Sequence, residues 1–178
     1  MKKRYREPEP LYAMGFFTMH ETGLVDQIIV FDYYDPDEYY WDLSQDPERL
    51  DKEKKMLLDN MQYYLDQEKV LINGSEAPPR VVNVELGFRG RKDLPYIIFF
   101  IEFKGELKRG LNSYVNIYEE EEAEYDYIVT WFFPENARVV RAELGVPYTI
   151  ESEGRSLVFR VSKGTVVGGR EAIYFRID

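Results

Sequence analysis

Residues 96–104 read YIIFFIEFK, and this apolar run decides the fold class. Successive side chains of a strand point to opposite faces of the sheet. One face of the run therefore carries only apolar residues: Ile97, Phe99, Ile101 and Phe103. The other face is mixed, because Glu102 and Lys104 follow Ile98 and Phe100 along it. The pattern predicts a central strand that is buried on much of both sides.

Working outward, other strand-like segments lie at regular spacing on both sides of this run, and Gly, Pro or Asn residues separate them. They cover residues 11–18, 25–34, 69–72, 81–88, 113–118, 123–133, 137–144, 147–151, 156–161 and 171–177. No alternation of strands with helices is present, which argues against a parallel α/β fold. The sequence predicts a mainly β (α+β) fold with an antiparallel β-sandwich or barrel-like core.

One helix is expected, at residues 47–68. Asp46 is a suitable N-cap, and Pro47 suits the first helical position. Apolar residues follow at helical spacing, with charged residues on the opposite side. We expect this stripe to pack against the sheets. The preceding segment, residues 34–45, is rich in Asp and Tyr and is expected to be a loop.

The composition shift near residue 80 divides the chain into three parts. Residues 1–10, which begin MKKRYR, are expected to form a flexible tail. Residues 11–80 are expected to form a hairpin plus the helix, and residues 81–178 an antiparallel β-sandwich. Because the apolar stripe of the helix must be buried, we expect the last two parts to be fused into one domain.

Composition excludes several kinds of chemistry. The 178 residues include no cysteine and one histidine, so thiol nucleophiles, disulfides, Cys-ligated zinc and His-rich metal sites are excluded. No phosphate-binding or dinucleotide-binding motif occurs, and no cofactor is expected. An enzyme is the less favoured expectation.

The charge balance bears on partners and location. The chain has 33 acidic and 23 basic residues, for a net charge of −10, which argues against binding to a nucleic-acid backbone. No apolar run approaches the roughly 20 residues of a membrane helix, so no membrane association is expected. We expect a cytoplasmic protein. The excess of Glu over Asp and the scarcity of Gln and Asn favour a thermophilic source.

Acidic residues near residue 40 are one candidate site. Asp32, Asp35, Asp37 and Asp42 could supply oxygen ligands to calcium, although their spacing does not match an EF-hand loop. The favoured interpretation is that these acids form turns and helix caps in a solvated segment. The leading expectation is therefore no metal site.

A pair of carboxylates is a second candidate. Glycoside hydrolysis requires two carboxyl groups within about 5–9.5 Å, beside aromatic side chains. Glu85 and Glu102 lie on predicted strands, and Glu102 interrupts an apolar run. A buried Glu102 would need a raised pKa or a cationic partner such as Lys104 or Arg89. A structural ion pair is the favoured interpretation.

The aromatic cluster Tyr39, Tyr40 and Trp41 is the preferred candidate site. Three adjacent rings in a loop cannot all point inward, and Tyr and Trp are common at interfaces. We therefore expect a non-enzymatic protein-binding or assembly module, with a protein partner or a homo-oligomer. The alternative is a carbohydrate-binding or glycoside-hydrolysing domain. The acidic run at residues 119–124 is expected to be a solvated edge, with docking of a basic partner as its alternative.

Overall fold

The structure is a computed structural model, and it describes residues 5–178. It contains two β-sheets packed together and one main helix, which confirms the predicted fold class. The wider sheet contains β1 (Glu9–Met19), β2 (Leu24–Tyr34), β5 (Arg80–Phe88), β6 (Pro95–Lys104), β8 (Asp126–Phe132), β10 (Tyr148–Glu151) and β11 (Ser156–Val161). The narrower sheet contains β3 (Lys69–Ile72), β4 (Ser75–Glu76), β7 (Gly110–Glu122), β9 (Ala137–Glu143) and β12 (Val166–Ile177). The helices are α1 (Tyr39–Ser44), α2 (Pro47–Leu65) and the short 3₁₀ turn η1 (Ser152–Gly154).

The strand order differs from a simple succession of hairpins. The seven-stranded sheet runs β10-β11-β8-β1-β2-β6-β5, and the five-stranded sheet runs β4-β3-β7-β12-β9. Within residues 5–178 one pair, β1 with β8, is parallel, and Gly15 lies opposite Val129 in its register. The chain between these strands is long, so it can make the crossover that a parallel pair requires. Alternation of apolar residues does not reveal strand direction, and the sequence therefore predicted antiparallel pairing throughout.

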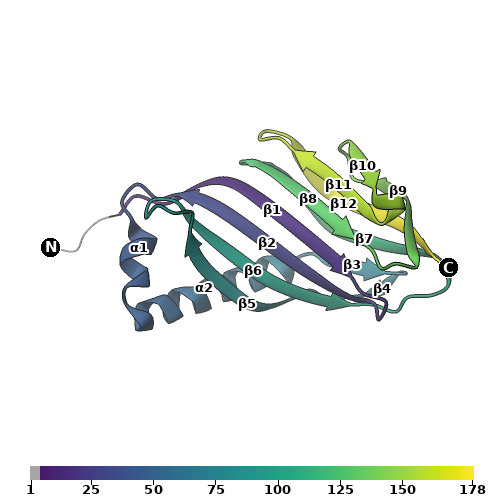
Figure 1. Cartoon of the computed structure of the whole chain (residues 1–178), viewed down its shortest axis with the longest axis horizontal. Coiled ribbons are helices and arrows are strands. Elements are labelled where there is room, and N and C mark those ends of the chain that lie inside the picture. Colours follow the sequence, from purple (N-terminus) through teal and green to yellow (C-terminus); the bar gives the residue numbers. More distant parts are fainter. Residues whose placement is uncertain (1–4) are drawn as a thin grey trace.

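Two different elements cover the inner face of the wide sheet. Helix α2 packs near β5 and β6, over a cluster that includes Leu65, Val84 and Phe99. The narrow sheet covers the other part, where Trp131 and Phe175 are almost completely buried. Figure 1 shows α2 beneath β5 and β6 and the strands of the narrow sheet toward the opposite end. Helix α2 and the narrow sheet therefore pack on neighbouring areas of the inner face.

The segment before α2 is helical and not a loop. Residues 39–44 form α1, and the buried carboxylate of Asp35 accepts a hydrogen bond from the backbone N–H of Tyr40 at 2.8 Å. This bond supplies an acceptor to a backbone N–H in the first turn of α1. The N-cap of α2 is as predicted, because the Asp46 side chain accepts from the N–H of Arg49. Within residues 5–178, neither helix combines the length and the apolar character that crossing a membrane requires.

The N-terminal segment makes contacts close to α1. Residues 1–4 of the expected tail lie outside the described part of the chain, whereas Glu9 and Pro10 already belong to β1. The Arg6 guanidinium lies 2.7 Å from the Asp37 carboxylate. The Tyr5 hydroxyl donates to Asp42 at 3.0 Å. From residue 5 onward the segment therefore packs against the body of the protein.

Candidate binding cavity between the two sheets

A cavity of about 640 Å³ lies where the two sheets and the end of α2 meet. Strands β1, β2, β8 and β11 form one side, β7 and β12 form the other, and the C-terminal half of α2 contributes Met61 and Leu65. Two inward positions of β1 are occupied by Ala13 and Gly15, whose small volume leaves space in front of the strand. The cavity therefore coincides with small residues at the middle of the wide sheet.

The wall formed by the wide sheet is apolar and aromatic. Phe17 and Trp131 stack with ring centroids 4.3 Å apart and planes inclined by 10°. Ile29 and Val129 line the same wall, and Phe31 lies edge-on to Tyr125. Stacked rings on neighbouring strands restrict one another's rotation, so this wall is held in place before any ligand arrives.

The wall formed by the narrow sheet is polar. Asn116 lies on β7 directly opposite Glu171 on β12. The Glu171 carboxylate accepts a hydrogen bond from the Tyr118 hydroxyl at 2.7 Å. The Glu68 carboxylate, just after α2, accepts from the Asn116 side-chain amide at 2.9 Å. Asn116 therefore stands between two carboxylates that line the same cavity.

Burial changes the acidity of these groups. Loss of solvent raises the pKa of both Glu68 and Glu171, and repulsion between the two carboxylates raises the pKa of Glu171 further. Burial also raises the pKa of Tyr125 to about 12. Desolvation penalises the charged form of an acid, which is the cause in each case. A buried acid without a cationic partner is often part of a functional site.

One polar atom in this wall has no hydrogen-bond partner in the described chain. The Oδ1 atom of Asn116 is buried, and no residue from 5 to 178 donates to it. Buried polar groups are almost always paired, by the protein, by water or by a ligand. The Oδ1 atom of Asn116 therefore marks a place where a bound molecule would find a hydrogen-bond partner.

The charged side chains that line the cavity are all acidic. Four Glu side chains line it, at positions 68, 119, 121 and 171, and no Lys, Arg or His from the described chain does. Glu119 and Glu121 belong to the acidic run that the sequence predicted to be a solvated edge. Both are exposed and lie at the end of β7, so the run contributes to the cavity lining. Tyr127 and Trp131 on β8 also border the cavity.

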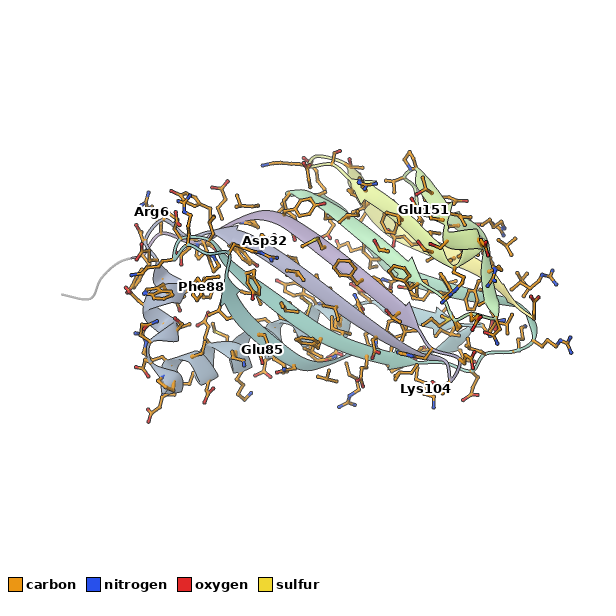
Figure 2. All side chains as sticks on the ribbon, viewed as in Figure 1. Arg6, Asp32, Glu85, Phe88, Lys104 and Glu151 are labelled. Atoms are coloured by element: carbon orange, nitrogen blue, oxygen red, sulfur yellow. The ribbon has the colours of Figure 1, made fainter. Side chains whose placement is uncertain are left out.

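The predicted aromatic site lies elsewhere, on α1. Tyr40 is 8% exposed and belongs to the apolar cluster under α2. The Tyr39 hydroxyl donates to Glu53 at 3.1 Å. The Trp41 ring lies edge-on to Phe88, with centroids 5.2 Å apart. Figure 2 shows Phe88 and Arg6 at the end of the molecule that carries α1. Helix formation turns these three adjacent rings in different directions and gives each an internal contact.

The predicted calcium ligands are dispersed among other contacts. Asp32 lies 2.9 Å from the Arg89 guanidinium, and Asp37 pairs with Arg6. Asp35 is fully buried at the start of α1, as described above, and Asp42 accepts from Tyr5. Within residues 5–178, no group of three or more Asp, Glu, His or Cys side chains is arranged to hold a metal ion.

The predicted carboxylate pair is not brought together. Glu85 lies opposite Ile98 in the register of β5 and β6, four positions from Glu102. At about 3.3 Å per residue this is roughly 13 Å along the strand, beyond the spacing of a glycosidase pair. Glu102 is exposed rather than buried, because β6 lies next to the edge strand and its outer face is open there. Glu85 pairs with Lys54 at 3.2 Å, which lowers the pKa of Glu85.

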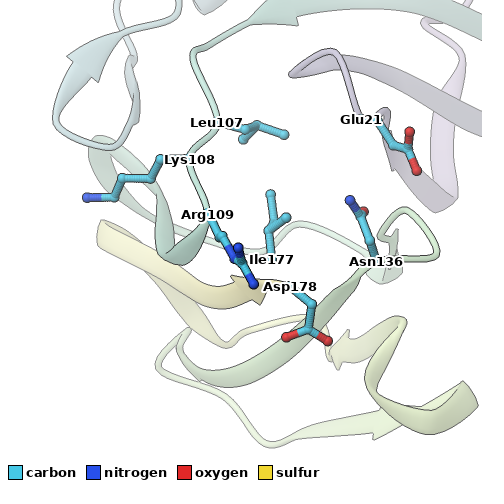
Figure 3. A pocket seen from close by; sticks show the side chains of 7 residues that line it. All are labelled: Glu21, Leu107, Lys108, Arg109, Asn136, Ile177 and Asp178. Carbon is cyan, nitrogen blue, oxygen red and sulfur yellow. The ribbon is translucent and has the colours of Figure 1, made fainter.

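A second, shallow hollow lies near the C-terminal residue. It has a volume of about 450 Å³ and is lined by Glu21, Leu107, Lys108, Arg109, Asn136, Ile177 and Asp178. Figure 3 shows that its charged side chains are of both signs. It lacks the aromatic wall of the larger cavity.

No protein-family model and no curated protein matches the chain. Solved structures of similar shape are distant. The folded domain of LppM from Mycobacterium tuberculosis is 12% identical, with a TM-score of 0.48 over 100% of this chain and 96% of that one. The M1 zinc metallopeptidase of Deinococcus radiodurans is 8% identical, with a TM-score of 0.39 over 95% of this chain and 42% of that one. An aminopeptidase N family protein of Idiomarina loihiensis is 8% identical, with a TM-score of 0.40 over 91% and 29%. These likenesses carry no inference about activity.

Proposed function

We propose that this chain is a binding protein that holds a small apolar ligand in the cavity between its sheets. The observation that carries the proposal is the combination of a stacked aromatic wall with a facing wall in which Oδ1 of Asn116 is buried without a hydrogen-bond partner. The volume of about 640 Å³ lies within the range of about 300–1,000 Å³ typical of small-molecule sites.

The energetics favour occupation of this space. Protein interiors are normally packed to the density of organic crystals, and water in contact with aromatic rings is unfavourable. A ligand that covers the partly exposed side chains of Phe17 and Val129 would remove this contact. The rings are already fixed by one another, so little ordering accompanies binding. Binding rather than catalysis is favoured because no nucleophile with an activating base is placed in this wall.

Titration with N-phenyl-1-naphthylamine, an uncharged fluorophore at neutral pH, tests the proposal. We expect one saturable site with a Kd of about 1–100 μM. Gly15→Leu fills the space in front of β1 and is expected to weaken binding about tenfold or more. The control is Val82→Leu, because Val82 is 51% exposed and does not line the cavity. Absence of binding by the folded protein, or equal binding by Gly15→Leu, would contradict the proposal.

A second candidate function is self-assembly, through the outer face of the wide sheet. Phe16, Ile28 and Phe100 are cross-strand neighbours on this face, and Phe16 is 37% exposed. Phe132, 46% exposed, continues the apolar surface. The proposed occupant is a second copy, because this uncharged centre allows two acidic chains to approach without opposing charges.

Light scattering of the purified protein tests this second candidate. We expect a dimer that Phe16→Glu converts to a monomer, since Phe16 is partly exposed and its replacement does not empty the core. Val82→Glu is the control for adding one charge elsewhere on the same sheet. A monomeric wild type, or a dimer unaffected by Phe16→Glu, would overturn the assembly proposal and leave the cavity proposal untouched.

A further inference from the structure

We propose that the cavity selects ligands in which a protonated amine is attached to an apolar, ring-sized body. This inference rests on the proposed binding function and names the chemical class of its ligand. Its basis is the set of acceptors around Asn116, the sign of the cavity's charge, and the aromatic wall opposite.

The acceptors around Asn116 number three. Glu68 uses Oε2 to accept from Asn116, and Glu171 uses Oε1 to accept from Tyr118. The other oxygen of each carboxylate has no donor in residues 5–178, and neither has Oδ1 of Asn116. Directly opposed residues on neighbouring strands have Cβ atoms about 4.5–5.5 Å apart, so Asn116 and Glu171 are adjacent. An ammonium group carries three N–H donors and no acceptor, and it matches this set.

The surrounding charges favour a cation over an anion. The groups that interact with Glu171 are the carboxylate of Glu68 and the phenols of Tyr114, Tyr118 and Tyr127, which are neutral at physiological pH. Among the lining residues no protein cation neutralises the carboxylates. By contrast, Arg141 and Arg170 both contact Glu143 on β9 and lower its pKa. A cationic ligand would therefore supply the positive charge that the cavity lining lacks.

The aromatic wall supplies the apolar half of the ligand site. Tyr114 lies 4.6 Å from Trp131 between ring centroids, so the two walls meet beside the acceptor set. A ligand ring can cover the partly exposed Phe17 and Val129 while its amine reaches Glu171 and Asn116. Aromatic faces also attract cations, which adds to the preference for a positively charged head. A carboxylate or sulfate head in the same position would face only acceptors and negative charge.

Three ligands with the same ring test this selectivity. 1-Naphthylmethylamine, 1-naphthalenemethanol and 1-naphthoate would each displace N-phenyl-1-naphthylamine from the wild-type protein. We expect the amine to bind about tenfold or more tightly than the alcohol, because charge-assisted hydrogen bonds are about twice as strong as neutral ones. The naphthoate is expected to bind more weakly than the alcohol. Equal binding of the three, or preference for the naphthoate, would overturn the inference.

Two variants test whether the charge of Glu171 causes the preference for the amine. Glu171→Gln keeps the shape and one acceptor but removes the charge, and is expected to reduce the amine's affinity about tenfold while leaving the alcohol's unchanged. Glu151→Gln is the control, because Glu151 is exposed on β10 and outside the cavity (Figure 2). An equal loss for amine and alcohol would show a change of shape and would contradict the charge-based account.

The pH profile is the second readout. Because the pKa values of Glu68 and Glu171 are raised, these carboxyls are more protonated in mild acid than exposed ones. The amine's advantage over the alcohol should therefore grow from about pH 5 to about pH 8, below the amine's own deprotonation. A constant ratio would overturn the inference. If the fluorophore itself fails to bind, the proposed function fails; if it binds without preference for the amine, only this inference fails.

Discussion

The effect of Gly15→Leu on the free energy of unfolding reports whether space exists in front of β1. A Cβ atom at Gly15 would lie 3.6 Å from Val129 Cγ2 and 3.8 Å from Phe17 Cε2, which are ordinary contact distances. Gly15 lines the cavity, so the longer side chain has room beyond its Cβ. Filling the space should stabilise the protein, whereas a packed site would be strained by the same change.

The magnitude follows from the atoms added. Replacing a strand glycine with alanine gains about 0.5–1 kcal/mol through the backbone entropy of the unfolded chain. The three further carbons of leucine gain about 0.8 kcal/mol each on burial, less about 0.5–1 kcal/mol of rotamer entropy. The net gain is about 2 kcal/mol, or roughly 4–8 °C in Tm for a chain of this size.

Urea denaturation and calorimetry measure this change, and Gly105→Ala is the matched control. A Cβ at Gly105 would lie 2.4 Å from Ile72 Cβ, so even alanine is expected to cost about 1–3 kcal/mol there. We therefore predict that Gly15→Leu raises the free energy of unfolding and that Gly105→Ala lowers it. A Gly15→Leu variant that is destabilised by a comparable amount would refute the reasoning, because it would mean that the position is fully packed.

Four further predictions follow from individual side chains. Because burial raises the folded pKa of Glu171, the wild type loses stability as pH rises from the ordinary pKa of 4.5 through that folded pKa. Glu171→Gln should therefore be more stable than the wild type at pH 8 and equal to it at low pH in urea titrations. Asp35→Ala removes the hydrogen-bond acceptor for the first turn of α1 and should lower the free energy of unfolding by about 1–2 kcal/mol. Asp35→Asn should lower it by less, and equal losses for the two variants in urea denaturation would contradict this. Tyr40→Ala should lower the free energy of unfolding by about 3–5 kcal/mol, because Tyr40 is buried. An unchanged midpoint of urea denaturation would instead support the predicted role of Tyr40 as an exposed binding residue. The Tm should be the same in calcium as in chelator, because Asp32 and Asp37 are each paired with arginine. A higher Tm in calcium would support a calcium site instead.

The fold was predictable where local chemistry determines structure. The Asp46–Pro47 start of α2 and the alternation of residues 96–104 depend on nearest neighbours, and both are present as expected. The parallel pairing of β1 with β8 depends on partners more than 100 residues apart, which no local pattern encodes. Helix α1 was missed because Asp35, four residues before it, supplies the acceptor for its first turn.

The cavity was not predictable for a related reason. Glu68 follows a helix and Glu171 lies near the end of the chain, and neither has a distinctive sequence context. Only the register of β7 with β12 places Asn116 between them. Glu102, in contrast, was conspicuous because it interrupts an apolar run, yet it is simply exposed on the outer face of β6. The signal that could have indicated a cavity is the small pair Ala13 and Gly15 on a strand otherwise rich in large apolar residues.

The most direct test of the binding cavity is to locate a bound ligand by NMR. Intermolecular nuclear Overhauser effects between 1-naphthylmethylamine and the protein would report which rings it touches. The account predicts contacts with the partly exposed rings of Phe17 and Tyr127, inside the cavity. Contacts with Phe16 or Phe132 on the outer face, or none at saturating ligand, would contradict it.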